Sequence, residues 1–227
     1  MNDVSIVEET ITFVKETLYN AEGGHDWFHI QRVFNNSLLI AKDEKVDILV
    51  VSLGALLHDI ADAKFYDGDE TIGPKMASTF LKSIGVRPKV ISHVVKIVEN
   101  ISFKSSLKNG NSKEKQFSSP EFQVVQDADR LDALGAIGIA RAFNYGGYKN
   151  RPLYDPNISP NLNMTKSAYK KSTAPTINHF YEKLLLLKNK MNTITGKKLA
   201  EERHQYMVNY LEQFYSEWNP LAIKSQV

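Results

Sequence analysis

One stretch of the chain, residues 46–60, limits the possible fold more than any other, because it is apolar on nearly every side when it is read as a helix. A helix with so little polar surface is stable in water only where other elements cover it all round. Its longest apolar run, ILVVSLGALL, is well short of the roughly 20 residues that cross a bilayer, so we expect no membrane span. The stretch therefore predicts a central helix inside a globular core.

Apolar residues recur at helical spacing through most of the remaining sequence, and no segment shows the alternation typical of a strand. The first helix should end at Gly23-Gly24, and Pro88 suits the first turn of another. The other predicted helices cover residues 26–42, 70–84, 88–101, 121–143, 176–191 and 196–218. A chain of 227 residues with 42% hydrophobic content can bury one core, whereas two full domains would be cramped. The sequence thus predicts a single all-α domain.

Two segments lack this periodicity. Residues 104–119 (KSSLKNGNSKEKQFSS) are polar and rich in Lys, Ser, Asn and Gly, which is typical of a surface loop. Residues 145–175 contain Gly146-Gly147, four of the eight prolines and several basic side chains. Irregular segments of that length are uncommon inside a compact domain and are more often functional than idle. We therefore interpret residues 145–175 as a candidate lid.

The composition excludes several kinds of site. The chain has no cysteine, so disulfides, thiolate zinc sites, iron–sulfur clusters and cysteine nucleophiles are ruled out, and any metal must be bound by histidine and carboxylate. The lack of cysteine fits a reducing compartment, and the acidic N-terminus lacks the features of a secretory signal, so we expect a cytoplasmic protein. A formal net charge of +2 does not suggest nucleic-acid binding.

Ionisable side chains interrupt the apolar pattern at three places. His29 lies on the predicted helix 26–42, and His58-Asp59 directly follows the apolar run LGALL. The segment VVQDADRLDAL places Asp127 and Asp129 in an apolar helix. Burial of such groups is costly unless they are paired or bind an ion. Two imidazoles and two carboxylates would suit manganese, iron, nickel, zinc or magnesium in a site that stays open to water and substrate.

Three motifs, in this order, carry a resemblance to a known family. They are GHDWFHIQRV around His29, LGALLHDIADAKF around His58-Asp59, and QDADRLDALGAIGIARAF around Asp129. Together they resemble the signature of the HD-domain phosphohydrolase superfamily, which is a histidine, a His-Asp doublet and a distant aspartate on separate helices. The sequence looks similar to a small bacterial subgroup related to nucleoside-triphosphate pyrophosphohydrolases. The segment INHFYEKLLLLKNKMNT extends the similarity, which then covers residues 24–218.

The resemblance implies which residues bind the metal. By it the ligands are His29, His58, Asp59 and Asp129. Asp129 is preferred to Asp127 because the family's aspartate directly precedes a basic residue, here Arg130. Related two-metal members carry two further histidines before that aspartate, whereas this sequence has only His93 there, which implies one divalent ion. Manganese is the first expectation, with magnesium, nickel, iron and zinc as alternatives. His25, although at ligand spacing, is expected beside the site or as a helix cap.

Further residues are candidates for catalysis or substrate binding. Asp62 lies one turn beyond His58, and the resemblance suggests that it orients or deprotonates the attacking water or protonates the leaving group. Lys64 would add positive charge for a phosphate. The alternatives are a solvated aspartate at a helix end and a surface lysine. Candidate substrate contacts, each with an ordinary structural role as its alternative, are Arg32, His93, Lys104, Arg130, Tyr145, Tyr148, Lys149 and His179.

The expected architecture, activity and partners also follow from the resemblance. It implies one HD-type bundle over residues 1–227, with a metal-binding core over about residues 24–135 and with helices 176–218 packed on that core. The implied reaction converts a (deoxy)nucleoside triphosphate to the monophosphate and pyrophosphate. The alternatives are a nucleotidase or general phosphatase that releases orthophosphate, and a module that binds metal or nucleotide without turnover. The expected partner is a small phosphorylated substrate, without nucleic acid or membrane, and a homodimer is left open.

Overall fold

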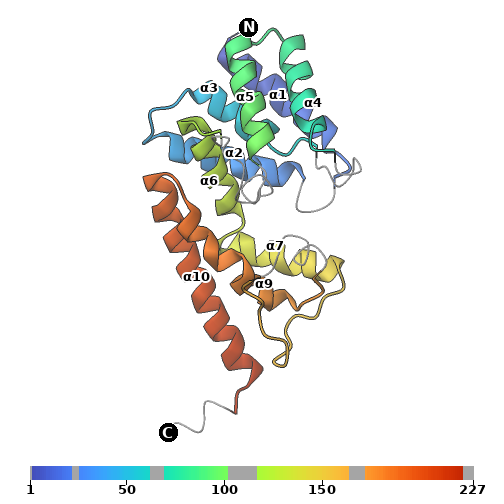
Figure 1. The fold of residues 1–227 in the computed structure, drawn as a ribbon, viewed down its shortest axis with the longest axis vertical. Helices are drawn as coiled ribbons and strands as arrows, with labels where there is room; N and C mark the ends of the chain where they lie inside the picture. The colour runs from blue at the N-terminus through green and yellow to red at the C-terminus, as the bar shows by residue number, and fades with distance from the viewer. Residues whose placement is uncertain (1, 22–25, 62–68, 102–116, 164–171, 222–227) are drawn as a thin grey trace. The chain divides into compact units, whose positions relative to one another are not determined.

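The computed structural model describes residues 2–21, 26–61, 69–101, 117–163 and 172–221. Regular structure within these ranges is helical and includes no strand, which confirms the all-α prediction (Figure 1). The chain divides into two compact units, residues 1–129 and residues 130–227. None of the described helices is both long and apolar enough to cross a membrane. The predictions of a single domain and of helices 176–218 packed on the metal-binding core stay predictions.

The first unit is built around its third helix. Its helices are α1 (Asp3–Thr17), α2 (Trp27–Ala41), α3 (Ile48–Leu57), α4 (Ile72–Ser83), α5 (Pro88–Asn100) and α6 (Pro120–Asp132), whose last residues belong to the second unit. α3 packs against α1, α2 and α5, and every residue from 49 to 57 is buried. The prediction of a central buried helix is therefore confirmed.

Local contacts determine where α3 begins and how closely its neighbours approach. The Asp47 carboxylate caps the helix by accepting hydrogen bonds from the backbone N–H groups of Leu49 and Val50, at 3.0 and 3.2 Å. Nearer the other end, a Cβ added at Gly54 would lie 3.2 Å from Ile97 of α5, so this glycine allows the two helices to pack closely. α3 therefore ends at a defined point in the core, directly before His58.

The segment predicted as one helix over residues 121–143 is two helices. α6 ends at Asp132, and α7 (Gly135–Tyr148) begins after a short break. Gly135 has a φ of +70°, a conformation that glycine adopts without the steric cost that other residues meet. α7 also extends further than predicted, so the irregular segment expected over residues 145–175 begins after Tyr148.

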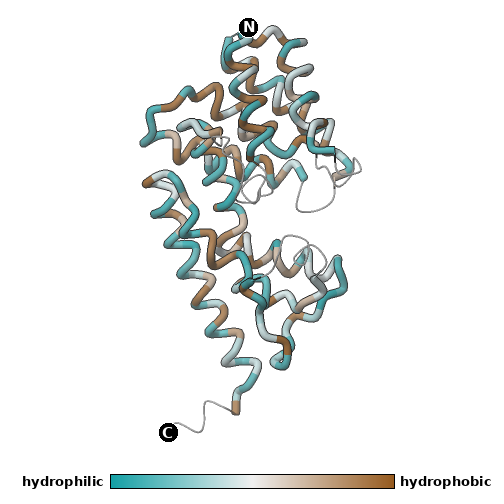
Figure 2. The backbone as a smooth tube through the Cα atoms, in the orientation of Figure 1, coloured by the Kyte–Doolittle hydropathy of each residue, from teal (hydrophilic) through white to brown (hydrophobic). Residues whose placement is uncertain are grey.

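The second unit has its core where α7 meets three later elements. These are α9 (Thr176–Glu182), the 3₁₀ helix η3 (Leu184–Lys190) and α10 (Ile194–Trp218). Both α9 and α10 contact α7 and η3. The Phe180 ring centroid lies 5.9 Å from that of Phe143 and 6.2 Å from that of Tyr210, so aromatic side chains of α9, α7 and α10 meet in the core. α10 alternates hydrophilic and hydrophobic positions along its length, as a helix with one buried face does (Figure 2).

Residues 176–191, predicted as one helix, change from α-helix to 3₁₀ helix at Lys183. Lys183 has φ −144° and ψ −57°, outside the α-helical region. Leu184 and Leu187 are three residues apart and both buried, and a helix with three residues per turn places them on one side. Both leucines therefore face the core of the second unit.

Candidate metal centre

Three helices of the first unit bring histidine and carboxylate side chains to one place. His29 lies in the first turn of α2, where the Asp26 carboxylate caps the helix by accepting a hydrogen bond from the His29 N–H at 3.0 Å. His58 and Asp59 directly follow α3. Asp129 lies on α6, at the end of the first unit. Helix ends and helix faces therefore set the position of each side chain.

The two imidazoles and the carboxylates form a compact group. One potential ligand atom from each of His29, His58 and Asp59 lies within 4.8 Å of the other two. Oδ1 of Asp129 lies 3.6 Å from Nε2 of His29 and 3.7 Å from Nε2 of His58. These distances exceed the usual hydrogen-bond length. They are close to the separation of two donors that each lie about 2.1 Å from a shared ion.

His58 is held in the tautomer that a metal ligand requires. Its Nδ1 donates a hydrogen bond to the Ala55 carbonyl oxygen at 2.8 Å, so Nε2 carries the lone pair. That Nε2 is buried and has no hydrogen-bond partner among the described residues. Burial lowers the pKa of His58, but the Asp129 and Asp59 carboxylates and the Ala55 carbonyl outweigh it, so the pKa is raised above its usual value. A cation here would satisfy the lone pair and offset the surrounding negative charge.

The structure distinguishes Asp129 from Asp127, the two aspartates that the sequence offers as metal ligands. The Asp129 side chain is 37% exposed and faces both imidazoles. Asp127 is completely buried, and residues two apart on a helix point to different faces. The geometry therefore brings Asp129 into the group with the histidines.

The donor set suits a divalent cation. Two imidazole nitrogens and two carboxylates form the mixed nitrogen and oxygen environment that manganese, iron, nickel, zinc or magnesium accepts. Leaving an imidazole lone pair buried and unsatisfied is costly, and an ion would remove that cost. Among the residues that the structure describes, His29, His58 and Asp59 are the one such group of three with ligand atoms this close.

Most of the other predicted site residues of the first unit cannot be compared with the structure. Asp62, Lys64 and Lys104 lie outside the described residues, as does His25, so their roles stay predictions. Arg32 is half-buried on α2, one turn after His29.

His93 makes contacts that join three segments of the first unit. Its Nε2 lies 2.8 Å from the Ser119 hydroxyl oxygen and 3.4 Å from Oε2 of Glu121. Glu121 also accepts a hydrogen bond from the Asp47 N–H, at 3.1 Å, just before α3. Of the two roles left open for His93, these contacts favour the interior structural one. Ser119 and Glu121 were missed because neither spacing nor composition distinguishes them.

The remaining predicted substrate residues lie in the second unit. Tyr145 and Tyr148 are exposed on α7, and the Lys149 amino group lies 5.8 and 4.7 Å from their ring centroids. The Arg151 guanidinium lies 5.4 Å from the Tyr145 centroid. All three contacts are cation–π interactions. Arg130 donates a hydrogen bond to the carbonyl oxygen of Lys190, which ties the end of α6 to η3.

His179, on α9, is neutral at physiological pH. Burial, followed by the positive charges of Lys183 and Arg151, lowers its pKa to about 3. The imidazole can therefore offer a ligand a hydrogen bond but no positive charge. Sequence reasoning did not single out Arg151 or Lys183, because only the fold brings them close to His179.

Known proteins are similar to this chain in both sequence and fold. The HD domain family model matches residues 27–134, a range that includes His29, His58, Asp59 and Asp129. YpgQ of Bacillus subtilis (strain 168) is 37% identical over 215 residues, which are 94% of either chain. A crystal structure of an HD-superfamily hydrolase from Bacillus thuringiensis matches with a TM-score of 0.75 and 42% identity, over 96% of this chain and 99% of that one. The crystal structure of B. subtilis YpgQ in complex with ADP matches with a TM-score of 0.74 and 33% identity, over 96% and 97%.

Proposed function

We propose a function from one premise: this chain belongs to the HD-domain superfamily and is a metal-dependent phosphohydrolase. We infer that its substrate is a nucleotide, and that it cleaves a (deoxy)nucleoside triphosphate to the monophosphate and pyrophosphate. We assign the divalent ion to His29, His58, Asp59 and Asp129, with manganese as the first expectation. Because the chain has no cysteine, we also expect the enzyme to act in the cytoplasm.

The observation that carries this assignment is the state of His58. The Ala55 carbonyl orients its ring, and the lone pair of Nε2 faces Asp129 without a hydrogen-bond partner among the described residues. Metal-ligating histidines typically donate their other ring N–H to a carbonyl or carboxylate in this way. A histidine with a purely structural role would be expected to have both nitrogens satisfied.

The site divides the chemistry between the ion and the protein. A divalent ion supplies Lewis acidity, which makes water nucleophilic at neutral pH and offsets charge on a phosphoryl oxygen. The Ala55 carbonyl orients the His58 ring so that its Nε2 faces Asp129, and Asp129, which is 37% exposed, leaves the group accessible from solvent. Asp62, outside the described residues, is our candidate for moving the proton.

Two observations support a nucleotide as the substrate. The relative YpgQ crystallised in complex with ADP. In the second unit, Lys149 and Arg151 lie against the ring of Tyr145, and aromatic faces with nearby cations suit bases and phosphate groups.

A product assay tests the proposal. The purified protein is supplied with manganese and a panel of ribo- and deoxynucleoside mono-, di- and triphosphates, and pyrophosphate and orthophosphate are measured separately. We expect pyrophosphate together with the monophosphate from one or more triphosphates. Orthophosphate from monophosphates would instead identify a nucleotidase or general phosphatase.

An isosteric variant separates an enzyme from a binding module. Asp59→Asn keeps the size of the side chain but removes a charged donor, and we expect it to lose both metal and turnover. Glu9→Gln, on the exposed face of α1, makes the same charge change and should retain both. If the wild-type protein binds manganese and nucleotide but releases neither product, the proposed activity is wrong.

A further inference from the structure

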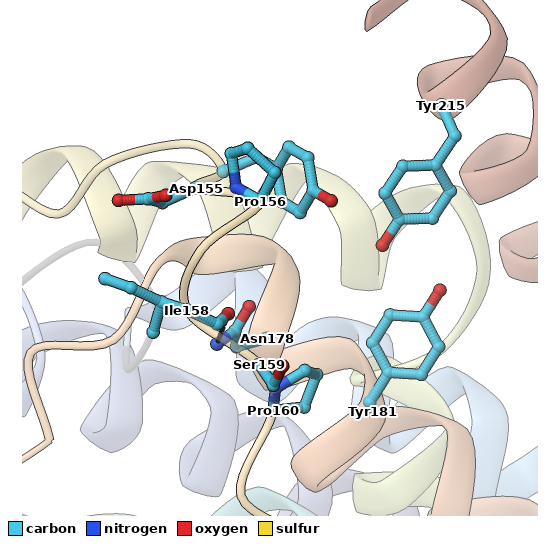
Figure 3. Close-up of a pocket in the computed structure, with 9 residues that line it drawn as sticks. Asp155, Pro156, Ile158, Ser159, Pro160, Asn178, Tyr181 and Tyr215 are labelled. Atoms are coloured by element: carbon cyan, nitrogen blue, oxygen red, sulfur yellow. Dashed lines mark hydrogen bonds between the residues drawn. The ribbon is translucent and has the colours of Figure 1, made fainter. Parts of the chain in front are cut away.

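A cavity in the second unit is lined by none of the residues assigned above to metal or substrate. Residues between 154 and 160 form one wall, Asn178 and Tyr181 of α9 form a second, and Tyr215 of α10 forms a third (Figure 3). Its volume is about 300 Å³, at the lower end of the range for ligand sites. We call it the tyrosine cavity. All of its first wall comes from residues 145–175, which the sequence predicts to be functional.

Three tyrosines give this cavity flat faces in fixed positions. The Tyr154 ring centroid lies 5.4 Å from that of Tyr215 and 5.1 Å from that of Trp218. The hydroxyl groups of Tyr181 and Tyr215 point toward one another (Figure 3). Burial, together with the neighbouring Tyr181 hydroxyl, raises the pKa of Tyr215, so its side chain stays a neutral phenol. Because the rings already hold one another, a ligand would not have to order them.

One polar group of the cavity has an unused acceptor. The Asn178 side chain is 1% exposed and donates a hydrogen bond from Nδ2 to the Ile158 carbonyl oxygen at 2.9 Å. Its Oδ1 is buried and has no hydrogen-bond partner among the described residues. Leaving a buried acceptor unsatisfied destabilises the folded protein. A ligand that brings an N–H or O–H donor would remove that cost.

Asp155 is the only charged residue among the described residues that line the cavity, and its charge is negative. Asp155 contributes a carboxylate, and its Oδ1 accepts hydrogen bonds from the backbone N–H and the side chain of Asn157, at 2.9 and 3.2 Å. No lining residue is basic. A phosphate or other anion would therefore be repelled here, whereas a cation would be attracted by the carboxylate and by the negative faces of the tyrosine rings.

We propose that the tyrosine cavity binds a small organic cation that carries a hydrogen-bond donor, such as an amine or an amino alcohol. Its positive charge would lie against the tyrosine rings, and its donor would reach Oδ1 of Asn178. This inference goes beyond the proposed hydrolysis, because it assigns a second site that prefers the opposite charge. The proposed substrate is an anion, whereas this ligand is a cation.

Calorimetric titration of the full-length protein in an amine-free buffer tests the proposal with three probes. Choline carries both a charge and an O–H donor, tetramethylammonium carries the charge alone, and 3,3-dimethylbutan-1-ol has the shape and the O–H of choline without the charge. A cation–π contribution of up to about 2 kcal/mol corresponds to a preference of up to about 30-fold for choline over the neutral alcohol. We expect tetramethylammonium to bind with intermediate affinity.

Matched variants locate the binding. Asp155→Asn keeps an acceptor for Asn157 and should weaken choline binding several-fold, whereas Glu201→Gln on the exposed side of α10 should leave it unchanged. Tyr215→Leu should weaken it further, and Tyr206→Leu, at an exposed position of the same helix, should not. If Tyr215→Leu fails to fold, Asp155→Asn still decides the question.

Three results would overturn the proposal. The first is equal affinity for choline and its neutral counterpart. The second is no binding of any probe at millimolar concentration. The third is choline binding that neither Asp155→Asn nor Tyr215→Leu changes. None of them bears on nucleotide hydrolysis, so the two proposals fail separately.

Discussion

The metal centre of the first unit and the tyrosine cavity of the second are built from different kinds of structure. His29, His58 and Asp129 are positioned by helices whose starts or ends are buried or capped. One wall of the cavity is formed by residues 154–160, which belong to no helix and are shaped by turns such as the one in which Asp155 accepts a hydrogen bond from Asn157. Sites on regular elements hold their geometry more accurately than sites on loops. We therefore expect the metal centre of the first unit to hold a fixed geometry, and the cavity of the second unit to adjust to its ligand.

Their electrostatics differ as well. In the metal centre, two carboxylates lie beside a buried imidazole whose lone pair is unsatisfied, an arrangement that suits a compact divalent ion. In the cavity, one carboxylate accompanies three neutral rings, which suits a larger and more diffuse charge. The two sites should thus respond independently to mutation.

The largest expected effect is that of His58→Ala, which removes the oriented lone pair. The metal content of the purified variant should fall to background, and kcat/KM should drop by about three orders of magnitude, because metal catalysis contributes several kcal/mol. Elemental analysis and the nucleotide assay measure these changes. His204→Ala, on α10, is the control. If the His58 variant retained the ion, His58 would not be a required ligand. If the variant lost choline binding along with the ion, the two sites would not be independent.

Core substitutions test whether each site depends on its own unit. Phe180→Ala removes a completely buried ring of the second unit and should reduce the free energy of unfolding by about 3–5 kcal/mol. We expect it to weaken choline binding while manganese binding by the folded protein persists. Leu56→Ala in α3 should cost about 2–5 kcal/mol and weaken manganese binding instead. Urea unfolding and metal titration measure both, and a reversed pattern would show that the sites are not separable.

Much of the first unit could be predicted because its signals are local. The apolar run of residues 48–57 and the capping Asp47 specify α3, so the predicted helix 46–60 differs from the observed Ile48–Leu57 only at its ends. The three motifs also predicted which side chains would lie close together. His29 and His58 both lie near Asp129, as those motifs implied. The comparisons confirm the family resemblance, while the ligand roles remain our proposal.

The second unit was harder to predict because long-range contacts decide its structure. The change to a 3₁₀ helix at Lys183 is marked by no glycine or proline in the sequence. Tyr154 and Tyr215 are far apart in the chain, and only the packing of α10 brings their rings together. The irregular length of residues 145–175, with four of the eight prolines, was the available signal, and it pointed to function without indicating a cavity.

One pH-dependent effect should arise in the second unit, from His179. The pKa of His179 is about 3 in the folded protein against 6.5 for a free histidine, so the unfolded chain takes up the proton first as the pH falls. Stability is therefore complete above pH 6.5 and declines toward pH 3, by at most about 1.4 kcal/mol per pH unit for a fully shielded group. Because the ring is partly exposed, we expect a loss of about 1 kcal/mol between pH 7 and pH 5.5.

His179→Gln should remove that dependence. The comparison is between the free energies of unfolding at the two pH values within each protein, so a constant cost of the substitution cancels. His204→Gln, whose pKa is also lowered by burial but at a more exposed position, serves as the control and should leave most of the dependence in place. An unchanged dependence in His179→Gln would mean that another group is responsible.

The smallest expected effects come from two helix caps. Asp47 caps α3 through two backbone N–H groups, and the Thr193 hydroxyl caps α10 by accepting from the Gly196 N–H at 2.9 Å. Replacing either by Ala should cost about 1 kcal/mol of stability. Only Asp47→Ala should also weaken manganese binding, because α3 ends at His58, whereas α10 carries no proposed metal ligand. Thermal unfolding with and without manganese measures both quantities, and equal losses of manganese affinity would show that metal binding does not depend on α3 in particular.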